Sequence, residues 1–117
     1  MGSIYCLFAS DDGTPRYVGK TTRQPERRWK EHVARALDKD EEGRLCEWVR
    51  DVLRRGELVQ FWVLQEDVAP VDLDTFEAYW TRQFPQLLND GVGVDEPTKL
   101  GRSIAASIKQ ALKRRAS

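Results

Sequence analysis

The alternation of apolar and polar residues predicts three β-strands. Residues 3–9 (SIYCLFA) are rich in β-forming side chains, the turn-forming run 11–15 (DDGTP) follows, and residues 16–20 (RYVGK) extend again, which is the pattern of a hairpin. A third strand is expected over residues 58–65, where apolar residues at 59, 61 and 63 alternate with Gln60 and Trp62.

Apolar residues spaced three and four apart predict four helices. These helices are expected over residues 25–37, 45–55, 73–84 and 98–115, with Pro25 at the start of the first, Gly56 after the second, and Asp72 or Asp74 capping the third. The order ββααβα plus a C-terminal helix predicts an α+β fold, in which a small three-stranded, largely antiparallel sheet is flanked by helices.

One compact domain is expected from length and composition. A chain of 117 residues with 40% hydrophobic residues can form one core but not two independent domains. Cys6 and Cys46 lie far apart and match no metal-binding or disulfide spacing, which indicates a reducing, cytoplasmic setting. The chain has no signal peptide and no run of about 18 apolar residues, so no membrane partner is expected.

Charge is segregated along the chain although the formal net charge is zero. Residues 1–35 carry 7 Lys/Arg and 4 Asp/Glu, residues 36–95 carry 6 and 14, and residues 96–117 carry 6 and 1. The basic ends could form a surface that faces phosphates, or they could simply be solvated faces. Charge alone does not decide between these readings.

Five short motifs in a fixed order resemble the GIY-YIG nuclease domain over roughly residues 3–90. They are Ser3-Ile4-Tyr5, Tyr17-Val18-Gly19, Arg28-Trp29-x-x-His32, Glu77-Ala-Tyr-Trp80 and Leu87-Leu-Asn89. Ser3 stands where the family has glycine and Val18 where it has isoleucine; both are small changes at scaffold positions. The resemblance suggests a nuclease domain over residues 1–95, with a basic amphipathic helix over residues 96–117 packed on it or appended to it.

The hairpin must place both motif tyrosines on one side of the sheet. A two-residue turn at Asp12-Gly13 would set Tyr17 against Phe8, on the face opposite Tyr5. We therefore expect a loop of odd length or a β-bulge.

The resemblance implies a phosphodiester hydrolase that uses one divalent metal, Mg²⁺ or Mn²⁺. Glu77 is the expected metal ligand, and it is the only acidic residue between Asp74 and Asp90, so a cluster of carboxylates holding two metals is not apparent. Magnesium keeps much of its shell as water and phosphate oxygen, which suits a single protein ligand. The structural alternative is that Asp74 and Glu77 form a capping pair.

The other motif residues are expected to surround the scissile phosphate. The resemblance makes Tyr5 the first choice to accept a proton from the attacking water, with Tyr17 orienting water or phosphate; the alternative is two strand tyrosines packed over the core. Arg28 and His32, four apart, share a helix face, and an arginine fork matches phosphate oxygens. The alternative for Arg28 is a surface ion pair with Glu31. The alternative for His32 is a half-buried ring whose hydrogen bonds are satisfied.

Asn89 is carried over as a support residue of the active site, although it could equally cap a turn. Further nucleic-acid contacts are expected from basic residues near the motifs and in the last helix: Lys20, Arg27, Lys109, Lys113, Arg114 and Arg115. The function expected is therefore a metal-dependent endonuclease with DNA as substrate. The alternative is an inactive nucleic-acid-binding or protein-interaction module on the same fold. A homodimer or a targeting partner protein remains open.

Overall fold

The computed structural model describes residues 1–38, 40–89 and 94–116 of the chain. Strand β1 (Gly2–Ala9) lies between β2 (Tyr17–Thr21) and β3 (Val59–Val68) and is antiparallel to both. The helices are α1 (Pro25–Ala36), α2 (Arg44–Arg54), the short η1 (Pro70–Asp72), α3 (Leu73–Thr81) and α4 (Lys99–Ala116). The predicted α+β fold and its order of elements are therefore confirmed.

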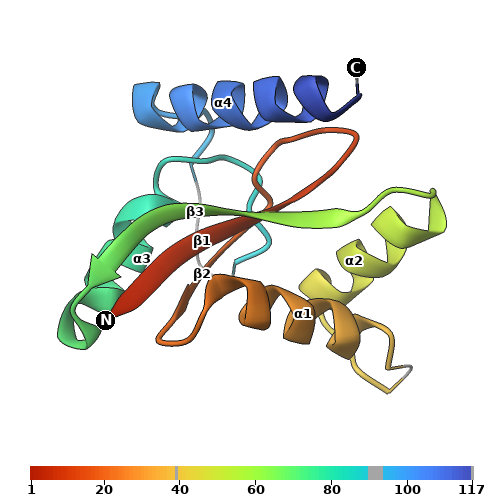
Figure 1. Cartoon of the computed structure of the whole chain (residues 1–117), viewed down its shortest axis with the longest axis horizontal. Helices are drawn as coiled ribbons and strands as arrows, with labels where there is room; N and C mark the ends of the chain where they lie inside the picture. Colours follow the sequence, from red (N-terminus) through yellow and green to blue (C-terminus); the bar gives the residue numbers. More distant parts are fainter. Residues whose placement is uncertain (39, 90–93, 117) are drawn as a thin grey trace.

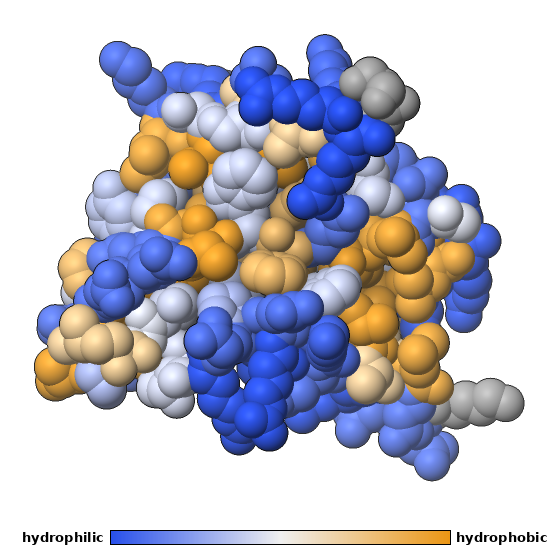
Figure 2. Space-filling view, in the orientation of Figure 1, coloured by the Kyte–Doolittle hydropathy of each residue, from blue (hydrophilic) through white to orange (hydrophobic). Residues whose placement is uncertain are grey.

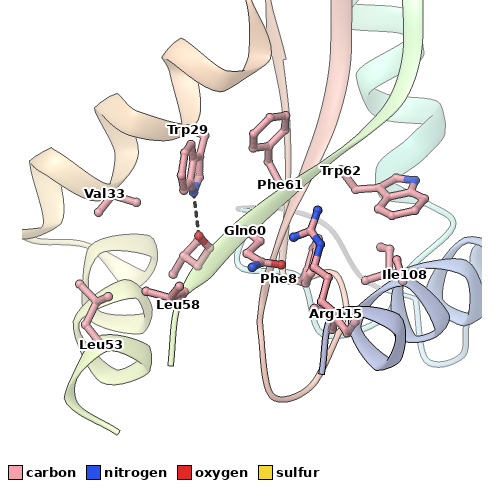
Figure 3. A pocket seen from close by; sticks show the side chains of 13 residues that line it. Phe8, Trp29, Val33, Leu53, Leu58, Gln60, Phe61, Trp62, Ile108 and Arg115 are labelled. Atoms are coloured by element: carbon pink, nitrogen blue, oxygen red, sulfur yellow. Dashed lines mark hydrogen bonds between the residues drawn. The ribbon is translucent and has the colours of Figure 1, made fainter. Parts of the chain in front are cut away.

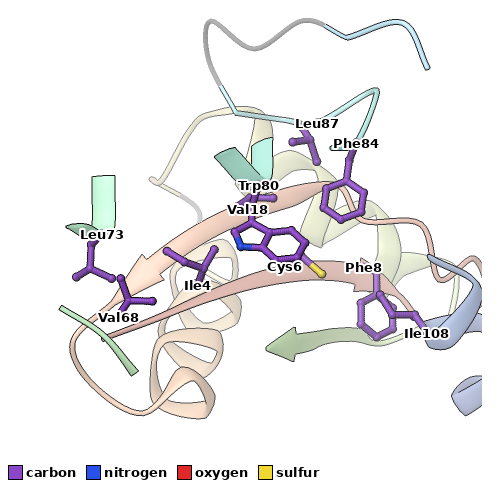
Figure 4. Close-up of a cluster of buried hydrophobic side chains, with 10 residues drawn as sticks. All are labelled: Ile4, Cys6, Phe8, Val18, Val68, Leu73, Trp80, Phe84, Leu87 and Ile108. Atoms are coloured by element: carbon purple, nitrogen blue, oxygen red, sulfur yellow. The ribbon is translucent and has the colours of Figure 1, made fainter. Parts of the chain in front are cut away.

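Helices cover both faces of the sheet. Figure 1 views the sheet close to edge-on, with β3 in front, α4 on one side of the sheet, and α1 and α2 on the other. Helices α3 and α4 contribute Leu73, Trp80 and Ile108 to one apolar cluster, which packs on Ile4 and Phe8 of β1 (Figure 4). Helices α1 and α2 pack against Tyr5, Leu7 and Ala9 on the opposite face. The last helix thus contributes to the core of the domain.

The β1–β2 hairpin places the two tyrosines as predicted. Tyr5 pairs with Gly19 and Leu7 pairs with Tyr17, so Tyr5 and Tyr17 have the same parity and point to the same face. The loop from Ser10 to Arg16 has an odd number of residues, which sets this register. Gly13 in this loop has a φ of +78°, a conformation that glycine adopts without strain.

Helix α3 is shorter than predicted and is capped differently. It ends at Thr81, because the chain turns before Pro85 and the side chain of Gln83 donates to the carbonyl of Tyr79. Phe84 is still buried, in an irregular segment after the helix. Asp72 is the N-cap residue without a side-chain capping bond, and Asp74 lies inside the helix, so the alternative of an Asp74–Glu77 capping pair is wrong.

The two edges of the sheet are covered to different extents. Along β2, the backbone N–H of Leu88 donates to the carbonyl of Arg16 at 2.6 Å, and the Asn89 side chain binds the backbone of Val18 twice. Along β3, no helix crosses in front of the strand in Figure 1. In the described part of the chain, no helix is long and apolar enough to cross a membrane.

Candidate active site

Tyr5 lies at the centre of a group of polar side chains between the sheet and α1. Its side chain is only 1% exposed, and its hydroxyl lies 2.7 Å from Nε2 of His32. The ring of Tyr17 meets His32 edge-on, with ring centroids 5.3 Å apart. Both tyrosines and the histidine of the motifs therefore form one contact group.

Gly19 makes room for this group. It pairs with Tyr5 across the hairpin, and a Cβ atom at residue 19 would lie 2.4 Å from the Tyr5 hydroxyl and 3.0 Å from the ring of Tyr17. The first separation is far below van der Waals contact, so a side chain here would displace the Tyr5 phenol. The motif glycine is thus required by packing and has no positive φ to explain it.

Helix α1 supplies the basic wall of the site. His32 is buried, and its burial, together with the positive charges of Arg28 and Arg35, lowers the pKa of His32 to about 4. The ring is therefore neutral at pH 7, which leaves one ring nitrogen as a hydrogen-bond acceptor. Burial raises the pKa of both Tyr5 and Tyr17, while the charge of Arg28 opposes that shift.

Arg28 is shared between the site and the surface. One of its terminal nitrogens lies 2.8 Å from a carboxylate oxygen of Glu31, whose other oxygen accepts from Arg23 at 2.9 Å. The surface pair that we considered as an alternative role for Arg28 is therefore present. It does not remove Arg28 from the site, because the positive charge of Arg28 lowers the pKa of both Tyr5 and Tyr17, which places the guanidinium near the two phenols. Glu31 orients Arg28 by binding one of its terminal nitrogens, and a guanidinium has five N–H donors in all.

Glu77 lies on α3, near enough to both tyrosines for its charge to act on them. Its charge raises the pKa of both Tyr5 and Tyr17, which places the carboxylate within electrostatic reach of each phenol. Partial burial raises the pKa of Glu77 itself, and the positive charge of Lys20 opposes this shift. Lys20 is bound by Asp74, one turn before Glu77 on the same helix. Glu77 therefore keeps its own carboxylate oxygens available.

The donor set suits a sparsely ligated hard cation. Among the described residues, no three His, Cys, Asp or Glu side chains gather closely enough to hold a metal ion. A lone, partly buried carboxylate such as Glu77 could hold Mg²⁺ or Mn²⁺, because these ions complete their shells with water and phosphate oxygens. A single carboxylate does not fit zinc, because proteins bind zinc through three or four of their own side chains.

Asn89 supports the site through the backbone of β2. Its side-chain oxygen accepts from the N–H of Val18 at 3.0 Å, and its nitrogen donates to the carbonyl of Val18 at 2.8 Å. Val18 directly follows Tyr17, so this pair of bonds fixes the strand that presents the tyrosine. Asn89 thus holds the backbone of β2, and it also lines the hollow that contains Tyr17, Arg28 and His32.

Two hollows in the surface differ in character. One, of about 520 Å³, borders the site and runs from Tyr17, Arg28 and His32 past Arg35 to the start of α2. The other, of about 370 Å³, is mostly apolar and lies beside β3, where α4 approaches the α1–α2 side (Figure 3). Figure 2, in the orientation of Figure 1, shows apolar side chains exposed on the face of the molecule where β3 lies. Of these two, only the first is lined by Tyr17 and His32, so it is the candidate substrate groove.

The remaining basic residues of the sequence analysis lie away from the tyrosines. Arg27 lines a third hollow near the N-terminus, on another side of α1. The basic residues Lys109, Lys113, Arg114 and Arg115 lie on α4, which packs on the opposite face of the sheet. Sequence reasoning did not single out Arg35, because one arginine among many on exposed positions has no local signal.

Comparison with known families agrees with this geometry. A family model described as the GIY-YIG catalytic domain matches residues 1–89. The chain belongs to the GIY-YIG family. The match contains all five GIY-YIG motifs, ends at Asn89, and leaves α4 outside the shared region. No curated protein and no solved structure matched the chain in parallel comparisons. Membership in the GIY-YIG family gives the protein a nuclease-type function and nucleic acid as the substrate class.

Proposed function

We propose that the protein is a metal-dependent endonuclease that hydrolyses phosphodiester bonds in DNA. The observation that carries the proposal is the 2.7 Å contact between Tyr5 and a neutral His32, in a site that also contains Arg28 and Glu77. Hydrolysis needs a proton acceptor for the attacking water and a positive charge near the phosphate. The four side chains supply both.

Tyr5 and His32 can act together as the proton acceptor. A buried phenol is a poor base by itself, because burial raises its pKa and disfavours the phenolate. As Tyr5 takes a proton from water, its own proton can move to Nε2 of His32, so that no free phenolate accumulates. The resulting hydroxide attacks phosphorus, and the bond from phosphorus to one sugar oxygen breaks. A bound phosphate stabilises the imidazolium, since its charge offsets that of Arg28.

Arg28 stabilises the charge that develops on the phosphate oxygens. Its guanidinium is planar and permanently charged, and Glu31 holds one of its nitrogens so that the fork has a defined orientation. Preorganised donors of this kind contribute strongly to hydrolysis, because they need no reorganisation when the charge appears.

Glu77 is the residue that would hold the divalent cation. The bound ion would supply Lewis-acid stabilisation of the phosphate and the leaving oxygen. The position of Glu77 favours this role, because its charge acts on both tyrosines and no described cation takes up its oxygens. Asp74 offers no comparable site, since it is exposed and bound to Lys20.

Replacement of Glu77 by glutamine tests the proposal. Glu77→Gln keeps the size and helix propensity of the side chain but removes the charge that would bind the ion. We expect cleavage of a DNA panel of duplex, single-stranded and branched substrates to be abolished with Mg²⁺ or Mn²⁺. DNA binding without metal and the melting temperature should stay close to those of the wild type.

Asp72→Asn is the matched control, because Asp72 is an exposed carboxylate on the same helical segment and asparagine caps helices equally well. It should cleave like the wild type. Full activity of Glu77→Gln would exclude the ligand role, and cleavage by the wild type in excess chelator would exclude the metal. If the wild type binds DNA but cleaves no member of the panel with either metal, the inactive binding module is the better reading.

A further inference from the structure

The groove beside the tyrosines contains an arginine to which the proposed chemistry gives no role. Arg35 follows Arg28 by seven residues and His32 by three on α1, so the three side chains project from the same side of the helix. Arg35 lines the groove together with Tyr17, Arg28 and His32. The helix therefore presents two cations to one hollow, one beside the tyrosines and one further along.

In the described part of the chain, Arg35 has no ion-pair partner, in contrast to Arg28, the other arginine that α1 presents to the groove. Arg23 and Arg28 share Glu31, and Arg55 is bound by Asp11 and Asp51. Among residues 1–38, 40–89 and 94–116, no hydrogen bond or ion pair engages the Arg35 side chain. Its charge nevertheless lowers the pKa of His32 and opposes the rise in the pKa of Tyr17. The guanidinium is thus close to the site and free to bind an anion.

We propose that this groove binds the nucleic-acid strand next to the scissile bond, with Arg35 contacting a flanking backbone phosphate. The inference rests on the proposed function, since it takes the scissile phosphate to lie at Arg28. Seven helical residues span roughly 10 Å, and phosphates of one strand recur at roughly 3.4 Å along a duplex axis. Arg35 therefore meets a phosphate roughly two to three nucleotides away from the one at Arg28.

The opposite wall of the groove fixes the path of the strand. Arg50 of α2 donates to the carbonyls of Ala36 and Asp38 at 2.6 Å each and to that of Glu41 at 2.5 Å, which ties this wall to the end of α1. Glu41, Glu42 and Arg44 line the groove on this wall, so two negative charges face one positive charge there. The net negative charge disfavours phosphates, so the backbone is kept on the α1 side, where Arg28 and Arg35 lie.

The test is the salt dependence of DNA binding by Arg35→Gln. Binding of a fluorescent duplex oligonucleotide is measured without metal over a range of NaCl concentrations. One lost phosphate contact should lower the magnitude of the slope of log K against log salt by about 0.9 and weaken binding severalfold at low salt. Arg35→Lys, which keeps the charge, should restore most of the slope. In cleavage, KM should rise while the rate at saturation stays within about twofold.

Arg54→Gln is the matched control, because Arg54 is exposed at the end of α2 and does not line the groove. It should leave the slope unchanged. An unchanged slope for Arg35→Gln, or an equal loss for Arg54→Gln, overturns the proposal. A lower saturating rate with unaltered binding also overturns it, since Arg35 would then act on the reacting phosphate. If the wild type cleaves nothing yet binding depends on Arg35, the groove assignment holds and the cleavage proposal fails.

Discussion

The two faces of the sheet are built from the same strands but have opposite character. Toward α1 and α2, β1 presents Tyr5, whose hydroxyl contacts His32. The charges of Arg28 and Glu77 act on this phenol. Toward α3 and α4, β1 presents Ile4, Cys6 and Phe8, which belong to one buried apolar cluster. Successive residues of one strand therefore serve different purposes, because side chains alternate between the faces.

This division separates stability from chemistry by position. The face toward α1 and α2 also contains a buried apolar cluster, so the separation concerns its polar side chains. Substitution of an exposed or partly exposed polar residue there should change cleavage with little effect on folding, whereas substitutions in the apolar cluster of the other face should do the reverse. The polar face has a cost, because burying titratable groups makes it sensitive to pH. The predictions below test this separation, beginning with the largest effect.

Among substitutions on α1, loss of the Arg28 guanidinium should have the largest effect on cleavage. Arg28→Ala should lower the single-turnover rate by on the order of a hundredfold or more, because a preorganised donor to the phosphate is removed. Arg28→Lys should recover only part of the rate, since an ammonium cannot reproduce the planar fork. The melting temperature should change little, since the lost pair with Glu31 is partly exposed.

Arg27→Ala is the natural control, because Arg27 lies beside Arg28 in sequence but lines a different hollow. A severe loss of cleavage in Arg27→Ala combined with a mild one in Arg28→Ala would show that the arginine of the motif has been misassigned.

Acid should destabilise the polar face through His32. The folded protein holds the pKa of His32 at about 4, below its ordinary value of 6.5, so the unfolded chain binds a proton first as the pH falls. Stability should therefore decrease between pH 6.5 and pH 4, by on the order of 2 kcal/mol from this residue. Urea unfolding at several pH values should show a shallower decrease in His32→Gln. An NMR titration that gives His32 a pKa near 6.5 would contradict the burial argument.

The smallest effect is expected on the apolar face. Ile108 of α4 is fully buried in the cluster with Phe8, and Ile108→Val removes one methylene group. Stability should fall by about 1 kcal/mol, with cleavage under saturating conditions unchanged and the same pH dependence as the wild type. A marked loss of cleavage at a temperature where the variant is folded would show that the two faces are coupled.

Local patterns were sufficient to predict most of the fold. The alternation in β1 and β3 and the spacing of apolar residues in α1, α2 and α4 predicted these elements close to their bounds. The odd-length hairpin loop followed from the requirement that two tyrosines share a face, which the register confirms. The end of α3 was missed, because the apolar stripe continues to Phe84 although the helical backbone does not.

Features of the site that depend on distant contacts had no local signal. The motif identified Gly19, but its role becomes visible only when the Tyr5 phenol lies over it. Asn89 binds Val18 across 71 positions of sequence, and the place of Arg35 in the groove beside Tyr17 follows only from the packing of α1 on the rest of the domain. Spacing along one helix predicted that Arg28 and His32 share a face, but not that Glu31 would hold Arg28.

The bonds between Asn89 and the backbone of β2 bear on how this domain could be transplanted into other proteins. A graft that ended before Asn89 would remove the partner of the N–H and carbonyl of Val18, in the same strand that presents Tyr17. A graft that included Asn89 but omitted α4 would uncover the cluster around Ile108. Portability therefore has two separate requirements, one for the geometry of the tyrosines and one for the solubility of the fragment.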